Sequence, residues 1–109
     1  MDPIYIVVGQ VGDVGDGEMK AIELSGRNMI LANVGGVYRV FARECPHEWV
    51  DLIDGDVYDN TITCAQHGYE FDLTSGECVT PLTWCTALTV VPTEVRGDEI
   101  CARLEIPAP

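Results

Sequence analysis

Two short segments near the middle of the chain each contain one cysteine and one histidine. One residue separates Cys45 from His47. Two residues separate Cys64 from His67, and sixteen residues lie between the two pairs. These are the only two histidines of the chain and two of its five cysteines. Because thiolate and imidazole are common ligands of zinc and iron, the spacing predicts one metal centre bound by two loops.

The order of the ligands bears on the kind of metal centre. Structural zinc sites more often pair cysteine with cysteine and then histidine with histidine along the chain. One cysteine and one histidine from each loop suit a cluster of two irons and two sulfides, with the cysteines on one iron and the histidines on the other. We therefore predict that a [2Fe-2S] cluster is bound by Cys45, His47, Cys64 and His67.

Two other uses of the same residues remain open at this point. The four side chains could bind zinc, which is colourless, whereas an iron–sulfur cluster is brown. Cys45 and His47 could instead act as a nucleophile and its base, although that leaves the second pair without a role.

The other three cysteines do not indicate a disulfide framework. The cysteine count is odd, and the chain shows no basic start followed by an apolar stretch that would mark an export signal. We expect Cys78, Cys85 and Cys101 to be small, reduced, buried residues.

The elements that position the loops are predicted to be strands. Apolar residues alternate or cluster in short β-branched runs, with turn residues between them and no helical pattern. The predicted strands are residues 4–8, 19–24, 28–34, 37–43, 87–95 and 99–106. Gly35 and Gly36 indicate a hairpin, and Pro92 indicates an edge strand or a bulge. The fold class is therefore all-β, an antiparallel sandwich or partly open barrel.

Residues 44–80 have a different composition from the predicted strands. This stretch holds nine acidic residues and no lysine or arginine, together with both histidines and three cysteines. We interpret residues 44–82 as a smaller metal-binding subdomain inserted into a β base, within a single domain of residues 1–109. The acidic surplus favours partners with basic surfaces, guided by Glu48 and Asp51 beside His47.

The net charge of the whole chain excludes some classes of function. Eighteen acidic and six basic residues give a formal net charge of −12 and a pI near 4.2. A nucleic-acid or anionic membrane surface needs clustered lysine and arginine, so neither is an expected partner. The longest apolar run, residues 4–8, is far too short to span a bilayer. We expect a soluble, cytoplasmic protein.

Several stretches around the two pairs resemble the Rieske ferredoxins. The resemblance is strongest to the small ferredoxin components of bacterial aromatic-ring-hydroxylating dioxygenase systems. It is carried by residues 45–52, 54–55, 64–72 and 74–77 and by Pro81. It implies a Rieske fold, with an antiparallel β base and a smaller cluster-binding subdomain.

The resemblance also implies roles for individual residues. Cys45 and Cys64 would bind the inner iron of the cluster, and His47 and His67 the outer iron near the surface. The segment 80–82 would be a proline loop that closes over the cluster. No residue is expected to be catalytic.

The function that this resemblance implies is electron transport. The protein would be a monomer that accepts one electron from an NADH-dependent reductase and delivers it to the terminal oxygenase of an aromatic-ring dioxygenase system. It would not be the oxygenase itself, which needs two more histidines for a mononuclear iron. The alternatives are a zinc-stabilised binding module and a non-redox Rieske-fold subunit of a larger reductase.

Overall fold

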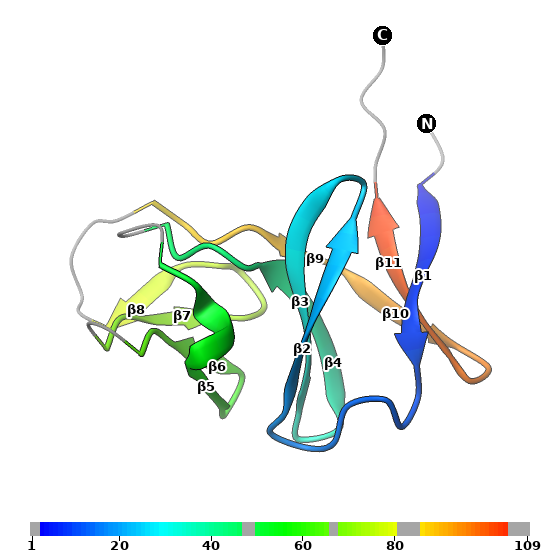
Figure 1. The fold of residues 1–109 in the computed structure, drawn as a ribbon, viewed down its shortest axis with the longest axis horizontal. Helices are drawn as coiled ribbons and strands as arrows, with labels where there is room; N and C mark the ends of the chain where they lie inside the picture. Colours follow the sequence, from blue (N-terminus) through cyan, green and yellow to red (C-terminus); the bar gives the residue numbers. More distant parts are fainter. Residues whose placement is uncertain (1–2, 47–49, 66–67, 81–85, 105–109) are drawn as a thin grey trace, which may run out of the picture.

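The computed structural model describes residues 3–46, 50–65, 68–80 and 86–104. Within these residues every regular element is a strand except one 3-10 turn, η1 (Leu52–Asp54), so the predicted all-β class is confirmed. The strands form three antiparallel sheets. Figure 1 shows two of them as a base on the right and the third as a smaller body on the left.

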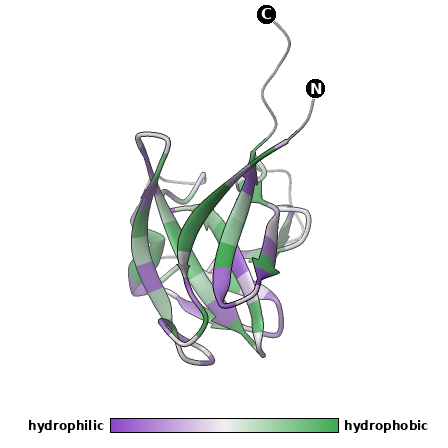
Figure 2. Ribbon diagram, turned by 90° about the vertical axis from the view of Figure 1, so that its right-hand side faces the viewer, coloured by the Kyte–Doolittle hydropathy of each residue, from purple (hydrophilic) through white to green (hydrophobic). Residues whose placement is uncertain are grey.

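The base consists of two sheets, with the strand orders β1-β11-β10 and β2-β3-β4-β9. Their strands are β1 (Ile4–Gln10), β2 (Met19–Leu24), β3 (Arg27–Val34), β4 (Val37–Ala42), β9 (Val90–Val91), β10 (Thr93–Arg96) and β11 (Glu99–Leu104). Figure 2 looks onto this base and shows apolar residues interrupted by polar ones along the strands. That alternation is typical of strands with one face buried and one face in water.

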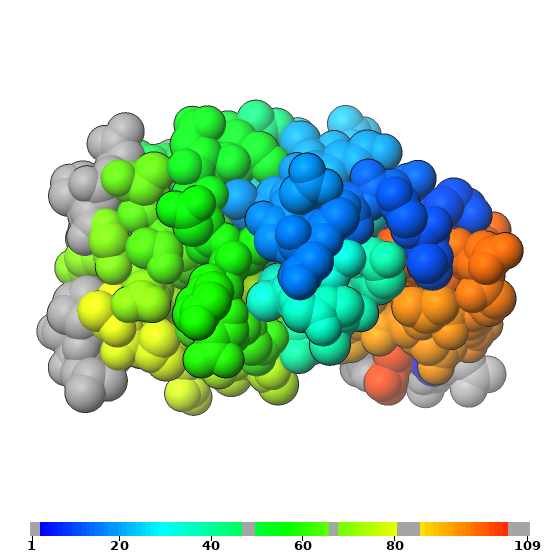
Figure 3. Space-filling view, turned by 90° about the horizontal axis from the view of Figure 1, so that it is seen from below, coloured from blue at the N-terminus to red at the C-terminus, as the bar shows by residue number. Residues whose placement is uncertain are grey.

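The third sheet, which we call the small sheet, has the order β5-β6-β7-β8. Its strands are β5 (Asp56–Tyr58), β6 (Thr61–Thr63), β7 (Glu70–Asp72) and β8 (Cys78–Thr80). They lie within the stretch interpreted as an inserted subdomain. Figure 3 shows green and yellow residues of this part in one half of the molecule and blue, cyan and orange residues of the base in the other.

Strand β3 lies between two hydrophobic cores and contributes side chains to both. Met29 and Leu31 pack into a core within the base, whereas Ile30 and Ala32 face a second core under the small sheet. All four side chains are at most 3% exposed. Because neighbouring residues of a strand point to opposite faces, one strand contributes to both cores and fixes the small sheet against the base.

The two cores are made of the following residues. The base core holds Val14, Leu24, Met29, Leu31, Val40, Ile100 and Ala102. The second core holds Ile30, Ala32, Val34, Phe41, Cys45, Leu52, Val57, Ile62, Cys64, Phe71, Leu73 and Leu88. Both cysteines of the predicted metal centre therefore belong to the second core.

The strand predicted over 87–95 is divided in the structure. Pro92 separates β9 from β10, and the two short strands lie at the edges of different sheets. Proline has no N–H to donate to a ladder, so the chain leaves one sheet there and enters the other. The edge position is confirmed, and the prediction of one continuous strand is wrong.

An arginine of the base forms hydrogen bonds with the small sheet. Arg39 on β4 donates from Nε to Asn60 Oδ1 at 3.0 Å and from Nη2 to Thr74 Oγ1 at 3.4 Å. Asn60 donates in turn to Thr74 Oγ1 at 2.9 Å. Asp59 and Asn60 form the tight turn between β5 and β6, both with positive φ. This contact joins β4 of the base to two turns of the small sheet.

No helix within the described residues is long and apolar enough to cross a membrane.

Candidate metal centre

The first predicted loop begins directly after strand β4 and is closed by backbone hydrogen bonds. Cys45 N–H donates to the carbonyl oxygen of Val50 at 2.8 Å. On the side of this bond away from the loop tip, Leu52 N–H donates to the carbonyl oxygen of Arg43 at 2.8 Å. Between these two hydrogen bonds, Glu44 forms an antiparallel bridge with Asp51. These bonds form a narrow neck at the base of the first loop.

The second loop begins after strand β6 and is closed in the same way. Cys64 N–H donates to the carbonyl oxygen of Tyr69 at 2.8 Å, and Gly68 N–H donates back to the Cys64 carbonyl at 3.0 Å. Gly68 has a φ of 70°, which glycine adopts without strain. In both loops, therefore, the cysteine N–H is bonded to the carbonyl five residues later. The two cysteines occupy equivalent positions.

Both cysteines are buried at the start of their loops. Cys45 is 0% exposed and Cys64 is 1% exposed, in the same core as Ile62 and Phe71. Neither sulfur is part of a disulfide. A thiolate in an apolar core is costly unless a cation binds it, so two such thiols at equivalent loop positions fit a shared metal site.

The two predicted histidine ligands lie outside the described residues. In sequence, His47 falls between Cys45 and Val50, within the first loop, and His67 falls within the second. Among the residues the structure does describe, no three histidine, cysteine or acidic side chains gather as a metal site. The described residues thus contain the two cysteines of the predicted set but neither histidine, and all four ligands stay a prediction. Pro81 and Leu82 of the predicted proline loop also lie outside the described residues.

An ion pair holds the neck of the first loop. Arg43 Nη2 lies 2.7 Å from Asp51 Oδ2, and Arg43 Nε donates to both carboxylate oxygens at 2.9 Å. Asp51 Oδ1 also accepts the N–H of Ile53 at 3.0 Å and so caps η1. The hydrogen bond from Arg43, followed by that from Ile53, lowers the pKa of the Asp51 carboxyl from its ordinary value.

The amino-acid sequence alone does not reveal this ion pair. Asp51 was expected to guide basic partners, but Arg43 already balances its charge. Arg43 directly precedes the stretch without basic residues, and seven residues lie between the two partners in sequence. The antiparallel bridge at the loop neck is what brings them together, and no residue type marks that bridge in the sequence.

A second carboxylate shapes the turn after β7. Asp72 Oδ1 accepts the N–H groups of Thr74 at 2.7 Å and Ser75 at 2.9 Å. These backbone hydrogen bonds, that of Ser75 first, lower the pKa of the Asp72 carboxyl. The turn brings Gly76 against Leu88, whose N–H donates to the Gly76 carbonyl at 2.7 Å. The turn thereby fixes the segment that follows residue 85 beside the small sheet.

The chain is similar to proteins of a known family over most of its length. The family model described as "Rieske [2Fe-2S] domain" matches residues 4–92. The ferredoxin component of the alkene monooxygenase system of Xanthobacter autotrophicus (strain ATCC BAA-1158 / Py2) is 28% identical over 97 residues, which cover 88% of this chain and 78% of that protein.

Solved structures with the same fold were also found. The ferredoxin of Sphingomonas yanoikuyae B1 matches with a TM-score of 0.80 and 25% identity, over 95% of this chain and 100% of that chain. A chain in a complex of reduced oxygenase and oxidized ferredoxin in carbazole 1,9a-dioxygenase matches with a TM-score of 0.80 and 22% identity, over 95% of this chain and 98% of that one.

Proposed function

Because the chain belongs to the Rieske [2Fe-2S] domain family, we propose that it is a one-electron carrier of an oxygenase system. It accepts an electron from an NADH-dependent reductase and passes it to the terminal oxygenase of an aromatic-ring dioxygenase system. The chain holds one Rieske-type [2Fe-2S] cluster, which supplies one-electron redox chemistry. The similarity to a ferredoxin component of an alkene monooxygenase system supports the carrier role.

The observation that carries this proposal is the pair of equivalent loop necks. Cys45 and Cys64 each start a loop, each is buried, and each donates its N–H to the carbonyl five residues later. In the proposal these two thiolates would bind the inner iron of the cluster. His47 and His67, one from each of the paired motifs, would bind the outer iron. Both histidines of the chain are then ligands, which leaves none for acid–base catalysis.

The two alternatives from the sequence are weaker than this proposal. Zinc binding is set aside because the family that matches is a [2Fe-2S] family. A non-redox subunit would have no need for the ligands, and this chain has all four candidate residues.

The proposal extends to how the chain is organised. We propose that residues 1–109 form one Rieske domain, with residues 44–82 as its cluster-binding subdomain, because β3 contributes to both cores. We further propose that it acts as a monomer in the cytoplasm, where NADH is available to its reductase. Sedimentation of the purified protein at the mass of one 11.9 kDa chain would test the monomer, and a sedimenting dimer would contradict it.

The cluster assignment is tested by replacing one loop cysteine and one distant cysteine. Cys64→Ser should lose the iron and sulfide of the purified protein and the EPR signal of the reduced form. Cys101→Ala is the matched control, because Cys101 is also buried but lies on β11 in the base. It should retain two irons and two sulfides. Loss of iron from both variants, or from neither, would contradict the assignment.

The carrier role is tested with the three purified components together. With NADH, the reductase and the oxygenase, product formation should depend on added wild-type chain. The Cys64→Ser chain should not support it. Equal product formation without the chain would contradict the proposal.

A further inference from the structure

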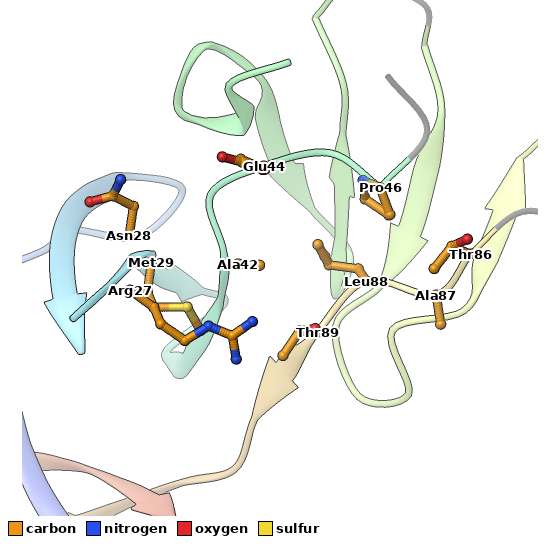
Figure 4. A pocket seen from close by; sticks show the side chains of 10 residues that line it. All are labelled: Arg27, Asn28, Met29, Ala42, Glu44, Pro46, Thr86, Ala87, Leu88 and Thr89. Carbon is orange, nitrogen blue, oxygen red and sulfur yellow. The ribbon is translucent and has the colours of Figure 1, made fainter. Parts of the chain in front are cut away.

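A cavity of about 450 Å³ lies beside the first loop. Figure 4 shows that it is lined from three parts of the chain: the start of β3, the end of β4 with the first loop, and residues 86–89. Pro46, next to the ligand Cys45, is part of its wall. The cavity therefore lies beside one of the two loops that are predicted to bind the cluster.

The floor of this cavity is apolar and its rim is charged. Met29 and Leu88 are each 3% exposed and belong to the two cores, so they form a rigid base. Arg27 and Glu44 are exposed at the rim. Figure 4 shows the Arg27 guanidinium extending into the cavity, with Glu44 on another side. A floor of this kind with a few charged groups above it is typical of sites that recognise a side chain.

Arg27 differs from other arginines of this acidic chain. Arg43 and Arg96 form ion pairs with Asp51 and Glu94. The guanidinium of Arg27, by contrast, makes no ion pair or hydrogen bond within the described part of the chain. With eighteen acidic residues to six basic ones, a cation left unpaired in a cavity is available to a carboxylate from another molecule.

We propose that this cavity receives an acidic side chain of the oxygenase, which pairs with Arg27 while apolar groups beside it rest on Met29 and Leu88. This inference deepens the proposed function and rests on it. The overall negative charge attracts a basic partner from a distance but does not fix how that partner is oriented. One pair between an acid of the partner and Arg27, in a cavity that Pro46 of the first loop also lines, would fix the orientation and so bring the partner's redox centre to the loops.

The test uses two charge reversals that change the net charge equally. Arg27→Glu and Lys20→Glu both take the formal net charge from −12 to −14. Lys20 is the matched control, because it is exposed on β2, does not line the cavity, and makes no ion pair among the described residues. The measurement is the rate at which each reduced chain, with its cluster loaded, reduces the purified oxygenase as the chain concentration is varied.

The two ideas of recognition predict opposite results for Arg27→Glu. If net charge alone decided binding to a basic oxygenase, both variants would reach half-maximal rate at an equal or lower concentration than wild type. The proposal expects Arg27→Glu to need about tenfold more chain, which corresponds to about 1.4 kcal/mol, because the variant loses a close charge pair at the interface. Lys20→Glu should match wild type or be slightly better. Arg27→Lys should recover most of the loss.

The maximal rate and the EPR signal of the reduced cluster should be the same in all four proteins, because Arg27 is not a ligand. Equal shifts for Arg27→Glu and Lys20→Glu would overturn the docking proposal and leave the carrier role intact. Failure of the wild-type chain to reduce the oxygenase would overturn the carrier role, and the docking proposal with it.

Discussion

Gly76 is the residue at which the turn after β7 meets the segment that returns to the base. Its φ is 83°, and a Cβ at this position would collide with the carbonyl oxygen of Leu88. Gly97 has a similar φ of 61°, with nothing within 4 Å of the place where a Cβ would lie. The two glycines therefore separate the cost of backbone strain from the cost of a collision.

We expect Gly76→Ala to be much more destabilising than Gly97→Ala. Strain alone should cost Gly97→Ala about 1 kcal/mol, and the added collision should bring Gly76→Ala to about 3 kcal/mol. Thermal unfolding followed by circular dichroism measures both. Equal loss of stability in the two variants would show that the backbone at residue 76 moves away from Leu88 without difficulty.

Two carboxyl groups make the stability of the folded protein depend on pH in the acidic range. The pKa of Asp51 and the pKa of Asp72 are both lowered in the folded protein. The unfolded chain then binds more protons, so the stabilisation is complete above the ordinary carboxyl pKa of about 3.9 and is lost as the pH falls below it.

Asp72→Asn tests this dependence at one residue. Asparagine still accepts the N–H groups of Thr74 and Ser75 but does not titrate. Between about pH 5 and pH 3, the variant should lose stability less steeply than wild type. Denaturant unfolding at a series of pH values provides the comparison, and Asp98→Asn, at an exposed turn of the base, is the control that should keep the wild-type slope. If Asp72→Asn also kept the wild-type slope, Asp72 would not contribute to the pH dependence of stability.

The four candidate ligands stand out in the sequence because their types and spacing are unusual and local, and their role stays a prediction. Cys45 and Cys64 are at equivalent positions in the structure, as the paired motifs indicate. The ion pair of Arg43 with Asp51 could not be predicted, because it depends on a bridge that only the folded loop creates. The proposed role of Arg27 could not be predicted from the sequence either, because it depends on the cavity that surrounds this residue in the folded chain.

The strands of the small sheet show why short elements escape sequence analysis. Each of β5 to β8 has three residues, which is too few to show an alternation of apolar and polar positions. They are stabilised by their neighbours and by buried residues such as Ile62 and Phe71, which are 0% exposed. The hairpin β3–β4, with longer strands and the Gly35-Gly36 turn, was by contrast predicted nearly to its ends.

Arg39 contributes to the contact between the base and the small sheet. We expect Arg39→Met to lower the local free energy of unfolding at this contact by about 1 kcal/mol, because the hydrogen bonds to Asn60 and Thr74 are lost. The amide of Leu73, which donates to the Asn60 carbonyl, should then exchange with solvent severalfold faster.

Hydrogen exchange of the Leu73 amide measures this effect. Arg96→Met is the matched control, because Arg96 pairs with Glu94 and stacks on Tyr5 in the base, away from the small sheet. It should leave the exchange of Leu73 unchanged. Equal exchange in wild type and Arg39→Met would mean that β3 alone fixes the small sheet.

In the proposed carrier role, the charge of the whole molecule would govern how it meets the oxygenase. The formal net charge is −12, and half of the acidic residues lie between 44 and 80. Asp51 is paired with Arg43, but Asp54, Asp56 and Asp59 are exposed in this part. An encounter for electron transfer has to be brief, so its interface is expected to be small and long-range attraction to set the association rate.

Electron delivery to the oxygenase should therefore slow as salt is added. The Debye length falls from about 10 Å at 0.1 M to about 3 Å at 1 M, which screens exposed acids from a basic partner. Asp56→Asn should slow delivery more than Glu99→Gln, because Asp56 pairs in register with Thr63, next to Cys64, whereas Glu99 is in the base. Stopped-flow reduction of the oxygenase across a salt series makes the measurement. A rate that does not change with salt would discard electrostatic attraction and leave contacts such as the Arg27 cavity to recognise the partner alone.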